Sequence, residues 1–231
     1  MPDHRQVYQS YAQQYQRLVG REDYQNNILR AINQILPLGG LDAVELGAGT
    51  GRLTCLFAPQ LRSILALDIS AAMLAVAGQR LRAGTAVNGF LAIADHRSLP
   101  AASRSFDLAV SGWSIAYLVS WSQTPAWQAE LNRALSEMKR VLRPGGRVVL
   151  LETLGTGFEA PTPPDTLKAY FRYLEEAGFE NNWIRTDYRF DTLQEAQELT
   201  RFFFGDDLAE QVVQKKWLIL PECTGIWWKE V

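Results

Sequence analysis

The chain has little cysteine and no concentration of positive charge. Its two cysteines, Cys55 and Cys223, are too few for a disulfide framework, which fits a reducing compartment such as the cytoplasm. Lysine and arginine total 23 against 25 acidic residues, giving a net charge of −2, and no block of basic residues is present. Because basic patches bring most proteins to a phosphate backbone, the composition argues against nucleic acid as a partner.

Long apolar runs are also missing. The longest, SILALDISAAMLAVA, carries Asp68 at its centre, and the first segment, MPDHRQVYQSYAQQY, has no apolar stretch typical of an export signal. We therefore expect neither a secretion signal nor a membrane span. What is present is the composition of an ordinary globular protein, 47% hydrophobic and 21% charged, and 231 residues predict one domain rather than two.

Helical and strand patterns alternate through the middle of the chain. Apolar residues at helical spacing before Gly39-Gly40 predict two leading helices. Five strand-like segments follow: AVEL, ILALD, GFLAIA, FDLAV and RVVLLE. Helical patterns between them begin near Arg52, at Ser70 and at Thr124-Pro125, and the turn Arg143 to Gly146 precedes the fifth strand. Strands joined by helical crossovers form an open parallel sheet, so the predicted class is α/β.

The pattern changes after Gly155. We expect a helix over residues 166–177, a strand over 183–190, helices over 193–217 and a last strand over 223–229. Since the parallel crossovers have ended, the last strand should lie antiparallel beside the fifth strand. No internal repeat or linker indicates a second domain.

The strongest motif is VELGAGTGRL, in which Gly47, Gly49 and Gly51 form the turn between the first strand and its helix. Glycines permit positive φ and remove side chains where a ligand approaches the backbone. The helix N-terminus that follows offers unpaired N–H groups. Such a turn alone is often only a tight connection, but Asp68 ends the second strand and Asp95 the third, on the rim of the ligand crevice.

The two rim acids suit an adenosine. Asp68 could accept both ribose hydroxyls, and Asp95 lies in reach of an adenine amino group. The alternatives are helix capping for Asp68, beside Ser70, and a solvated turn acid for Asp95, in DHRS. The turn reads G-T-G-R, with Arg52 where a dinucleotide-binding turn has glycine, and acidic Glu45 suits an ammonium better than phosphates. A carboxylate-and-amine ligand is therefore favoured over a pyrophosphate.

The motifs VELGAGTGR, ALDIS, ADHRSLP, SFDLAVSGWSIAYL and EMKRVLRPGGRVVLLE, in this order, cover roughly residues 41–154. Together they resemble the small-molecule class I S-adenosylmethionine-dependent methyltransferases, especially the ubiquinone/menaquinone-biosynthesis-like group. The resemblance implies a Rossmann-like fold: a mostly parallel seven-stranded sheet with helices on both faces and extra N-terminal and C-terminal helices. It implies a single domain, 1–231, with a helical lid (1–38), a cofactor-binding core (41–154), and C-terminal helices with antiparallel edge strands (155–231). S-adenosylmethionine would be the cofactor and a small molecule the methyl acceptor.

The resemblance also implies which residues would bind the cofactor. The methionine part would be held by Glu45, Gly47, Ala48, Gly49 and Gly51, with Ser111 and Gly112 at its amino end and Trp113 at the acceptor border. The adenosine would be held by Asp68 at the ribose, by Ile69 and Met73 flanking the adenine, and by Asp95 and His96 at its edge. The leading segment, with Tyr11 and Tyr15, would close over the cofactor as a mobile lid.

Methyl transfer from a sulfonium is an in-line displacement and needs no invariant base, so the catalytic residue is left open. If the acceptor loses a proton, the candidate bases are Glu152 at the tip of the fifth strand, His4 and His96. Alternatively, Glu152 is a paired surface acid, His4 belongs to a frayed terminus, and His96 lies beside the adenine without contacting the acceptor. No metal is expected. The run Phe202-Phe203-Phe204 indicates core.

Neither the acceptor nor the oligomeric state follows from these patterns, although a homodimer is compatible with them. Two other functions also fit. One is a nicotinamide-dependent oxidoreductase on a related sheet, and the other is a non-catalytic protein that keeps the binding site.

Overall fold

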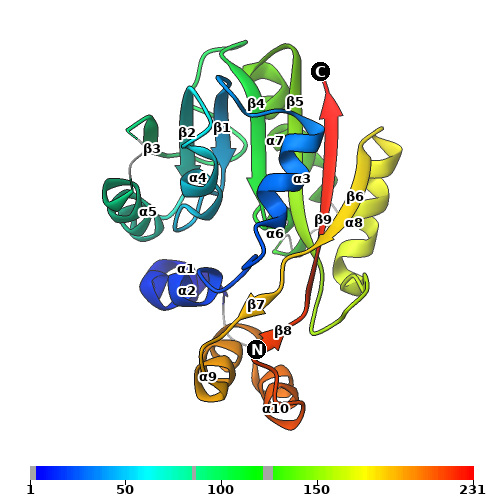
Figure 1. The fold of residues 1–231 in the computed structure, drawn as a ribbon. Helices are drawn as coiled ribbons and strands as arrows, with labels where there is room; N and C mark the ends of the chain where they lie inside the picture. Colours follow the sequence, from blue (N-terminus) through cyan, green and yellow to red (C-terminus); the bar gives the residue numbers. More distant parts are fainter. Residues whose placement is uncertain (1–3, 85–86, 122–126) are drawn as a thin grey trace.

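Five apolar segments form the parallel part of a central sheet in the computed structural model, which describes residues 4–84, 87–121 and 127–231. The strand order is β3-β2-β1-β4-β5-β9-β6 (Figure 1). The parallel strands are β1 Asp42–Leu46, β2 Ser63–Asp68, β3 Gly89–Ile93, β4 Phe106–Gly112 and β5 Leu142–Thr156. β9, Glu222–Glu230, lies antiparallel between β5 and β6, Glu180–Arg185. The predicted class and the antiparallel insertion of the last strand are confirmed.

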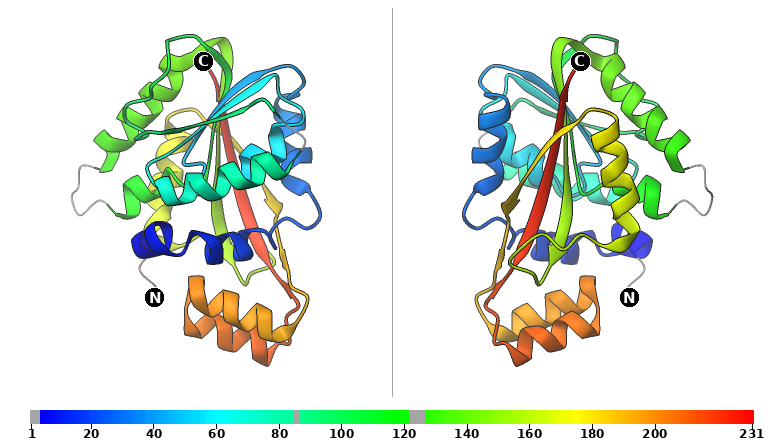
Figure 2. Two further views of the ribbon diagram at one scale, coloured as in Figure 1. Left: turned by 90° about the vertical axis from the view of Figure 1, so that its left-hand side faces the viewer. Right: turned by 90° about the vertical axis from the view of Figure 1, so that its right-hand side faces the viewer.

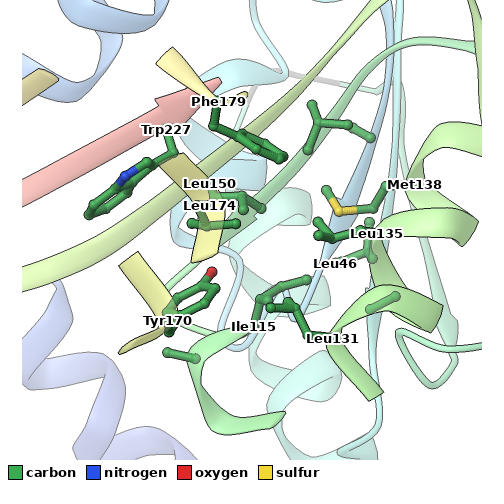
Figure 3. Packing of buried hydrophobic residues seen from close by; sticks show 14 of the residues in the cluster. Leu46, Ile115, Leu131, Leu135, Met138, Leu150, Tyr170, Leu174, Phe179 and Trp227 are labelled. Carbon is green, nitrogen blue, oxygen red and sulfur yellow. The ribbon is translucent and has the colours of Figure 1, made fainter. Parts of the chain in front are cut away.

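Both faces of the sheet are buried at its central strands β1, β4 and β5, whose successive residues point to opposite sides. In β5, Val148 and Leu150 join one apolar cluster, while Val149 and Leu151 join another. The first cluster packs against α6 Ala116–Ser120, α7 Trp127–Val141 and α8 Asp165–Glu176 (Figure 3). The second packs against α3 Asn27–Ile35 and α4 Arg52–Phe57. This arrangement explains why the fifth strand reads as a continuous apolar run.

The leading segment differs from the prediction of two helices, which is wrong. It forms α1 His4–Ser10 and α2 Ala12–Val19 before α3 begins. The chain leaves helical geometry at Tyr11, whose φ and ψ are −125° and 31°. α1 and α2 pack against α5, Ala71–Ala83, which Ser70 caps as predicted by accepting a hydrogen bond from the Met73 amide.

The C-terminal part also departs from the expected boundaries. The expected strand over 183–190 is split, because β7 Tyr188–Arg189 leaves the main sheet and pairs with β8 Ile219–Leu220. The expected helices over 193–217 are α9 Leu193–Phe204 and α10 Asp206–Gln214, which break at Gly205 where φ is 96°. The turn Arg143 to Gly146 is an irregularity within β5 rather than a turn before it, and the expected helix start at Thr124-Pro125 lies outside the described residues.

The helices from the two ends of the chain lie together beyond the carboxyl ends of the parallel strands. Figure 2 shows α1 and α2 between the sheet and the hairpin formed by α9 and α10. A small apolar cluster joins them, with Leu18 of α2 against Leu199 of α9 and Val212 of α10. Within the described part of the chain, the helices are all too short or too polar to cross a bilayer.

Candidate functional site

The glycine turn between β1 and α4 is shaped by left-handed backbone geometry. Gly47, Gly49 and Gly51 have φ values of 72°, 54° and 78°. A Cβ on Gly47 would lie 1.8 Å from Ser114 Oγ, so any side chain there would collide with the segment after β4. The amides of Gly47 and Ala48 both donate to the carbonyl of Leu67, at 2.8 and 2.9 Å, and this ties the turn to β2.

Asp68 connects the glycine turn to the start of α5. One carboxylate oxygen accepts from the Gly49 amide and the other from the Ser70 amide, each at 2.8 Å. The local contact with Ser70 is the kind expected from the capping alternative. A carboxylate offers about four acceptor positions, so both oxygens retain capacity for ligand hydroxyls.

A cavity of about 620 Å³ opens over this rim. It brings together twelve of the predicted cofactor residues: Tyr15, Glu45, Gly47, Ala48, Gly49, Asp68, Ile69, Met73, Asp95, His96, Gly112 and Trp113. They come from α2, from the ends of β1, β2 and β4, from the start of α5 and from the loop after β3.

Three predicted residues lie outside the cavity lining. Gly51 caps α4 and faces Ala77 of α5. Ser111 is buried within β4, and its hydroxyl donates to the carbonyl of Leu46 at 2.9 Å. Tyr11 is 45% exposed, and its ring contacts Phe202 of α9. The side chains of Ser111 and Tyr11 are directed by partners distant in sequence.

The cavity acids have different environments. Glu45 is buried, and desolvation raises its pKa to about 8 although the Thr54 hydroxyl donates to it at 2.5 Å. Asp95 lies two residues beyond β3 rather than at its end. There the guanidinium of Arg97 binds it at 2.6 Å and lowers its pKa to about 2. The two acids are therefore in opposite protonation states at neutral pH.

His96 and Trp113 lie where the loop after β3 meets the segment after β4. His96 Nε2 is 3.2 Å from Ser114 Oγ, and burial lowers the pKa of the imidazole, which keeps it neutral at neutral pH. Trp113 has a φ of 51°, uncommon for a large side chain, and its amide donates to the carbonyl of Leu151 at 2.7 Å. His96, Trp113 and Ser114 all line the cavity.

The cavity has other walls that the predicted set of cofactor residues omitted. Tyr8 of α1 and Tyr117 of α6 line it with their hydroxyls 2.5 Å apart, and Arg52 and Ser114 also contribute. Tyr8 has helical spacing with Tyr11 and Tyr15, and this is the signal that could have found it. For Arg52 the signal was only its place after the glycine turn, since its partner Glu22 lies thirty residues earlier.

The candidate bases Glu152 and His4 both lie outside the cavity lining. Glu152 is inside β5 rather than at its tip, and it accepts hydrogen bonds from the Ala116 amide at 3.0 Å and the Tyr170 hydroxyl at 3.3 Å. His4 stacks on Phe203 with ring centres 4.4 Å apart. His96 is the candidate base that lines the cavity.

Known proteins with sequences similar to this chain are methyltransferases. Residues 44–150 match the model of a methyltransferase domain. The chain is 35% identical over 139 residues to the ubiquinone/menaquinone biosynthesis C-methyltransferase of Hahella chejuensis, covering 58% of this chain and 49% of that protein. It is 30% identical over 154 residues to the malonyl-acyl-carrier-protein O-methyltransferase of Pectobacterium atrosepticum, covering 64% and 54%. The chain thus spans about half the length of the curated relatives it matches.

The fold comparison reaches further along the chain. A methyltransferase structure from Aquifex aeolicus superimposes with a TM-score of 0.57 over 89% of this chain and 90% of that one, at 13% identity. That likeness concerns the fold, whereas the domain match rests on the sequence that forms the glycine turn, the rim and the central strands. From the glycine turn to the fifth strand, the chain is therefore similar to S-adenosylmethionine-dependent methyltransferases of the ubiquinone/menaquinone type.

Proposed function

We propose that the chain binds S-adenosylmethionine in this cavity and catalyses transfer of its methyl group to a small-molecule acceptor. The observation that carries the proposal is that one cavity contains both the glycine turn and Asp68, joined by the hydrogen bond from the Gly49 amide. The bare backbone of the turn admits close approach of the cofactor, Asp68 accepts from its ribose, and Glu45 faces its ammonium group.

The residues around the cavity fit the chemistry of this cofactor, which supplies an electrophilic methyl group on a sulfonium. The acceptor forms a bond to the methyl carbon as the carbon–sulfur bond breaks, and S-adenosylhomocysteine leaves. Tyr8, Tyr15, Tyr117 and Trp121 line the cavity with aromatic rings whose faces attract a positive charge. Their contribution is to exclude water and align the reactants. His96, neutral at this position, takes a proton if the acceptor carries one.

The relatives bear on the class of acceptor. One is named for carbon methylation in quinone biosynthesis and the other for oxygen methylation of a carrier-bound malonyl group. We propose a small organic acceptor rather than nucleic acid, in line with the net charge of −2. We also propose a cytoplasmic location and a homodimer; light scattering on the purified chain tests the homodimer.

The leading segment is proposed to act as a lid over the cofactor. Tyr8 and Tyr15 line the cavity from α1 and α2, and the Ser70 hydroxyl donates to the Tyr8 carbonyl at 2.9 Å. Deleting residues 1–20 should weaken S-adenosylmethionine binding while the sheet stays folded. Unchanged affinity in a truncated protein with a native circular dichroism spectrum would exclude a lid.

Titration calorimetry with S-adenosylhomocysteine and NAD tests the proposed function. The unmutated protein should bind S-adenosylhomocysteine, and Asp68→Ala should raise the dissociation constant roughly ten- to hundredfold, because hydrogen bonds to a charged acceptor contribute about 1.5–3 kcal/mol. Binding of NAD in place of S-adenosylhomocysteine would support the oxidoreductase alternative and contradict ours.

A screen of methyl acceptors then separates an enzyme from a non-catalytic binding protein. Release of S-adenosylhomocysteine that depends on an added acceptor establishes catalysis. Tight cofactor binding with no turnover across carbon, oxygen and nitrogen nucleophiles would favour the non-catalytic alternative.

A further inference from the structure

A buried ion pair extends from the cavity into the protein behind the glycine turn. Arg52 is the first residue of α4, and its Nη1 donates to Glu22, which lies in the loop after α2. The side chains of Arg52 and Glu22 are 17% and 2% exposed. The guanidinium carbon of Arg52 also lies 3.5 Å from the centre of the Trp113 ring. One part of the guanidinium is therefore held by a carboxylate and one of its faces by an indole.

This pairing leaves part of the guanidinium uncommitted. An arginine has five N–H donors, and Glu22 takes one of them through Nη1. Among the residues that the structure describes, Nε and Nη2 have no protein acceptor, while Arg52 lines the cavity. By contrast Arg97, which lines the same cavity, is bound by both Asp95 and Glu130. Arg52 therefore offers unused donors to a cavity ligand.

A second buried acid interacts electrostatically with Glu22. Glu222 of β9 is 2% exposed and accepts from the Thr153 hydroxyl at 2.7 Å. Burial, followed by the charge of Glu22, raises the pKa of Glu222, so that it is uncharged near neutral pH. Glu22 is the acid that pairs directly with Arg52. One oxygen of each acid, Glu22 Oε1 and Glu222 Oε2, is buried without a hydrogen-bond partner among the described residues.

We propose that Arg52 binds the carboxylate of the cofactor's amino-acid moiety, and that Glu22 is a positioning residue that fixes the guanidinium for this contact. An arginine with a free edge matches a carboxylate in a planar, two-bond arrangement, and the Trp113 ring sets that plane. The inference rests on the proposed function and deepens it. Arg52 makes recognition depend on the amino-acid end of the ligand, whereas Asp68 binds the adenosine end.

Two ligands separate these ends of the cofactor. S-adenosylhomocysteine carries the amino acid, whereas methylthioadenosine shares the adenosine and sulfur but has no carboxylate. Calorimetry should show that Arg52→Gln raises the dissociation constant of S-adenosylhomocysteine roughly ten- to hundredfold and changes that of methylthioadenosine less than about threefold. Glu22→Gln should show the same selectivity at roughly three- to tenfold, because the guanidinium remains but is less fixed.

A matched control is Arg62→Gln, which removes a guanidinium paired with Asp42 outside the cavity and should leave both affinities unchanged. Thermal unfolding shows whether each variant is folded. If Arg52→Gln is not, Arg52→Lys keeps the charge but lacks the planar fork, and it should show the same selective loss.

The outcomes distinguish this inference from the proposed function. Selective loss for S-adenosylhomocysteine supports it. Equal weakening of both ligands means that the ion pair is only structural, and an unchanged S-adenosylhomocysteine affinity means that Arg52 serves the acceptor or nothing; either result overturns the inference while leaving the proposed function intact. If the unmutated protein binds neither ligand, both are overturned.

Discussion

The two sides of the cavity are built in different ways. On the rim side, the glycine turn and Asp68 are joined by hydrogen bonds between residues fewer than twenty-five positions apart, such as Gly49 to Asp68 and Gly47 to Leu67. On the cover side, α1 and α2 are held by α9, and the His4 ring stacks on Phe203 at 199 positions' separation. The rim is continuous with the sheet, whereas the cover depends on contacts between the two ends of the chain.

Because of this difference, we expect the rim to determine the affinity for the cofactor and the cover to control access to the cavity. The rim is formed by strand ends and backbone amides, so its geometry is as rigid as the sheet. The cover is formed by short helices joined mainly by aromatic contacts, and such elements open at lower free energy than the core. We therefore expect changes on the rim to weaken cofactor binding more than changes on the cover do.

The largest effect is expected from Gly47→Ala on the rim. The left-handed φ of 72° costs a non-glycine residue about 1–2 kcal/mol, and the new Cβ would overlap Ser114, adding about 1–3 kcal/mol. The added methyl group also lies where the cofactor approaches the backbone. We expect at least a roughly hundredfold loss of S-adenosylhomocysteine affinity. Urea unfolding and calorimetry measure the two effects.

Gly145→Ala is the matched control for that change. Gly145 has a φ of 79°, but a Cβ there would meet nothing within 4 Å. It should lose about 1–2 kcal/mol of stability and no affinity. Equal losses of affinity in the two variants would show that steric fit at Gly47 is irrelevant to the ligand.

A change in pH should have an intermediate effect on cofactor affinity, because Glu45 changes its protonation state. Its pKa is raised by burial from an ordinary value of 4.5 to about 8, so the empty protein holds a proton there at neutral pH. A cofactor ammonium favours the charged carboxylate, and binding therefore releases the proton. S-adenosylhomocysteine affinity should rise as pH increases from 6 to 8, by at most about tenfold per unit, and level off above 8. Glu45→Gln should remove this dependence.

A variant of Glu152 tests whether the pH dependence of binding comes from the place of Glu45 in the cavity or from the burial of any acid. The pKa of Glu152 is likewise raised by burial to about 8, but it lies outside the cavity. Glu152→Gln should therefore leave the pH dependence of binding unchanged. For both acids the folded pKa is the higher one, so the empty protein loses stability as pH rises from 4.5 to about 8, by at most about 1.4 kcal/mol per unit for each group. Either glutamine variant should flatten that slope.

The smallest effect is expected from Phe203→Ala on the cover. Phe203 contacts His4 and Tyr15, and aromatic pairs contribute about 0.5–1.5 kcal/mol each. Its loss should speed hydrogen exchange in α1 and α2 and weaken S-adenosylhomocysteine about three- to tenfold, without changing exchange in the sheet. Phe202→Ala, whose ring contacts only the exposed Tyr11 among the described aromatic rings, should change affinity much less. If Phe203→Ala weakens the sheet equally, the cover is part of the core.

Much of the rim could be predicted because its signals are local. A strand end, a glycine turn and an acid at the next strand end follow from periodicity and spacing, and they place Gly47, Gly49 and Asp68 around one cavity. Predictions failed where a residue's direction depends on a distant partner. Tyr11 turns to Phe202, and Glu152 is enclosed by Ala116 and Tyr170.

The sequence by itself determined the parallel sheet, the antiparallel last strand and the rim, since these depend on apolar periodicity and on glycines that alone tolerate the turn. Only the tertiary structure decided that β7 leaves the sheet, that α9 holds α1 and α2, and that Glu22 meets Arg52. The physical reason is that these contacts join segments far apart in the chain. Their energy comes from burial and charge pairing in three dimensions, which no local pattern encodes.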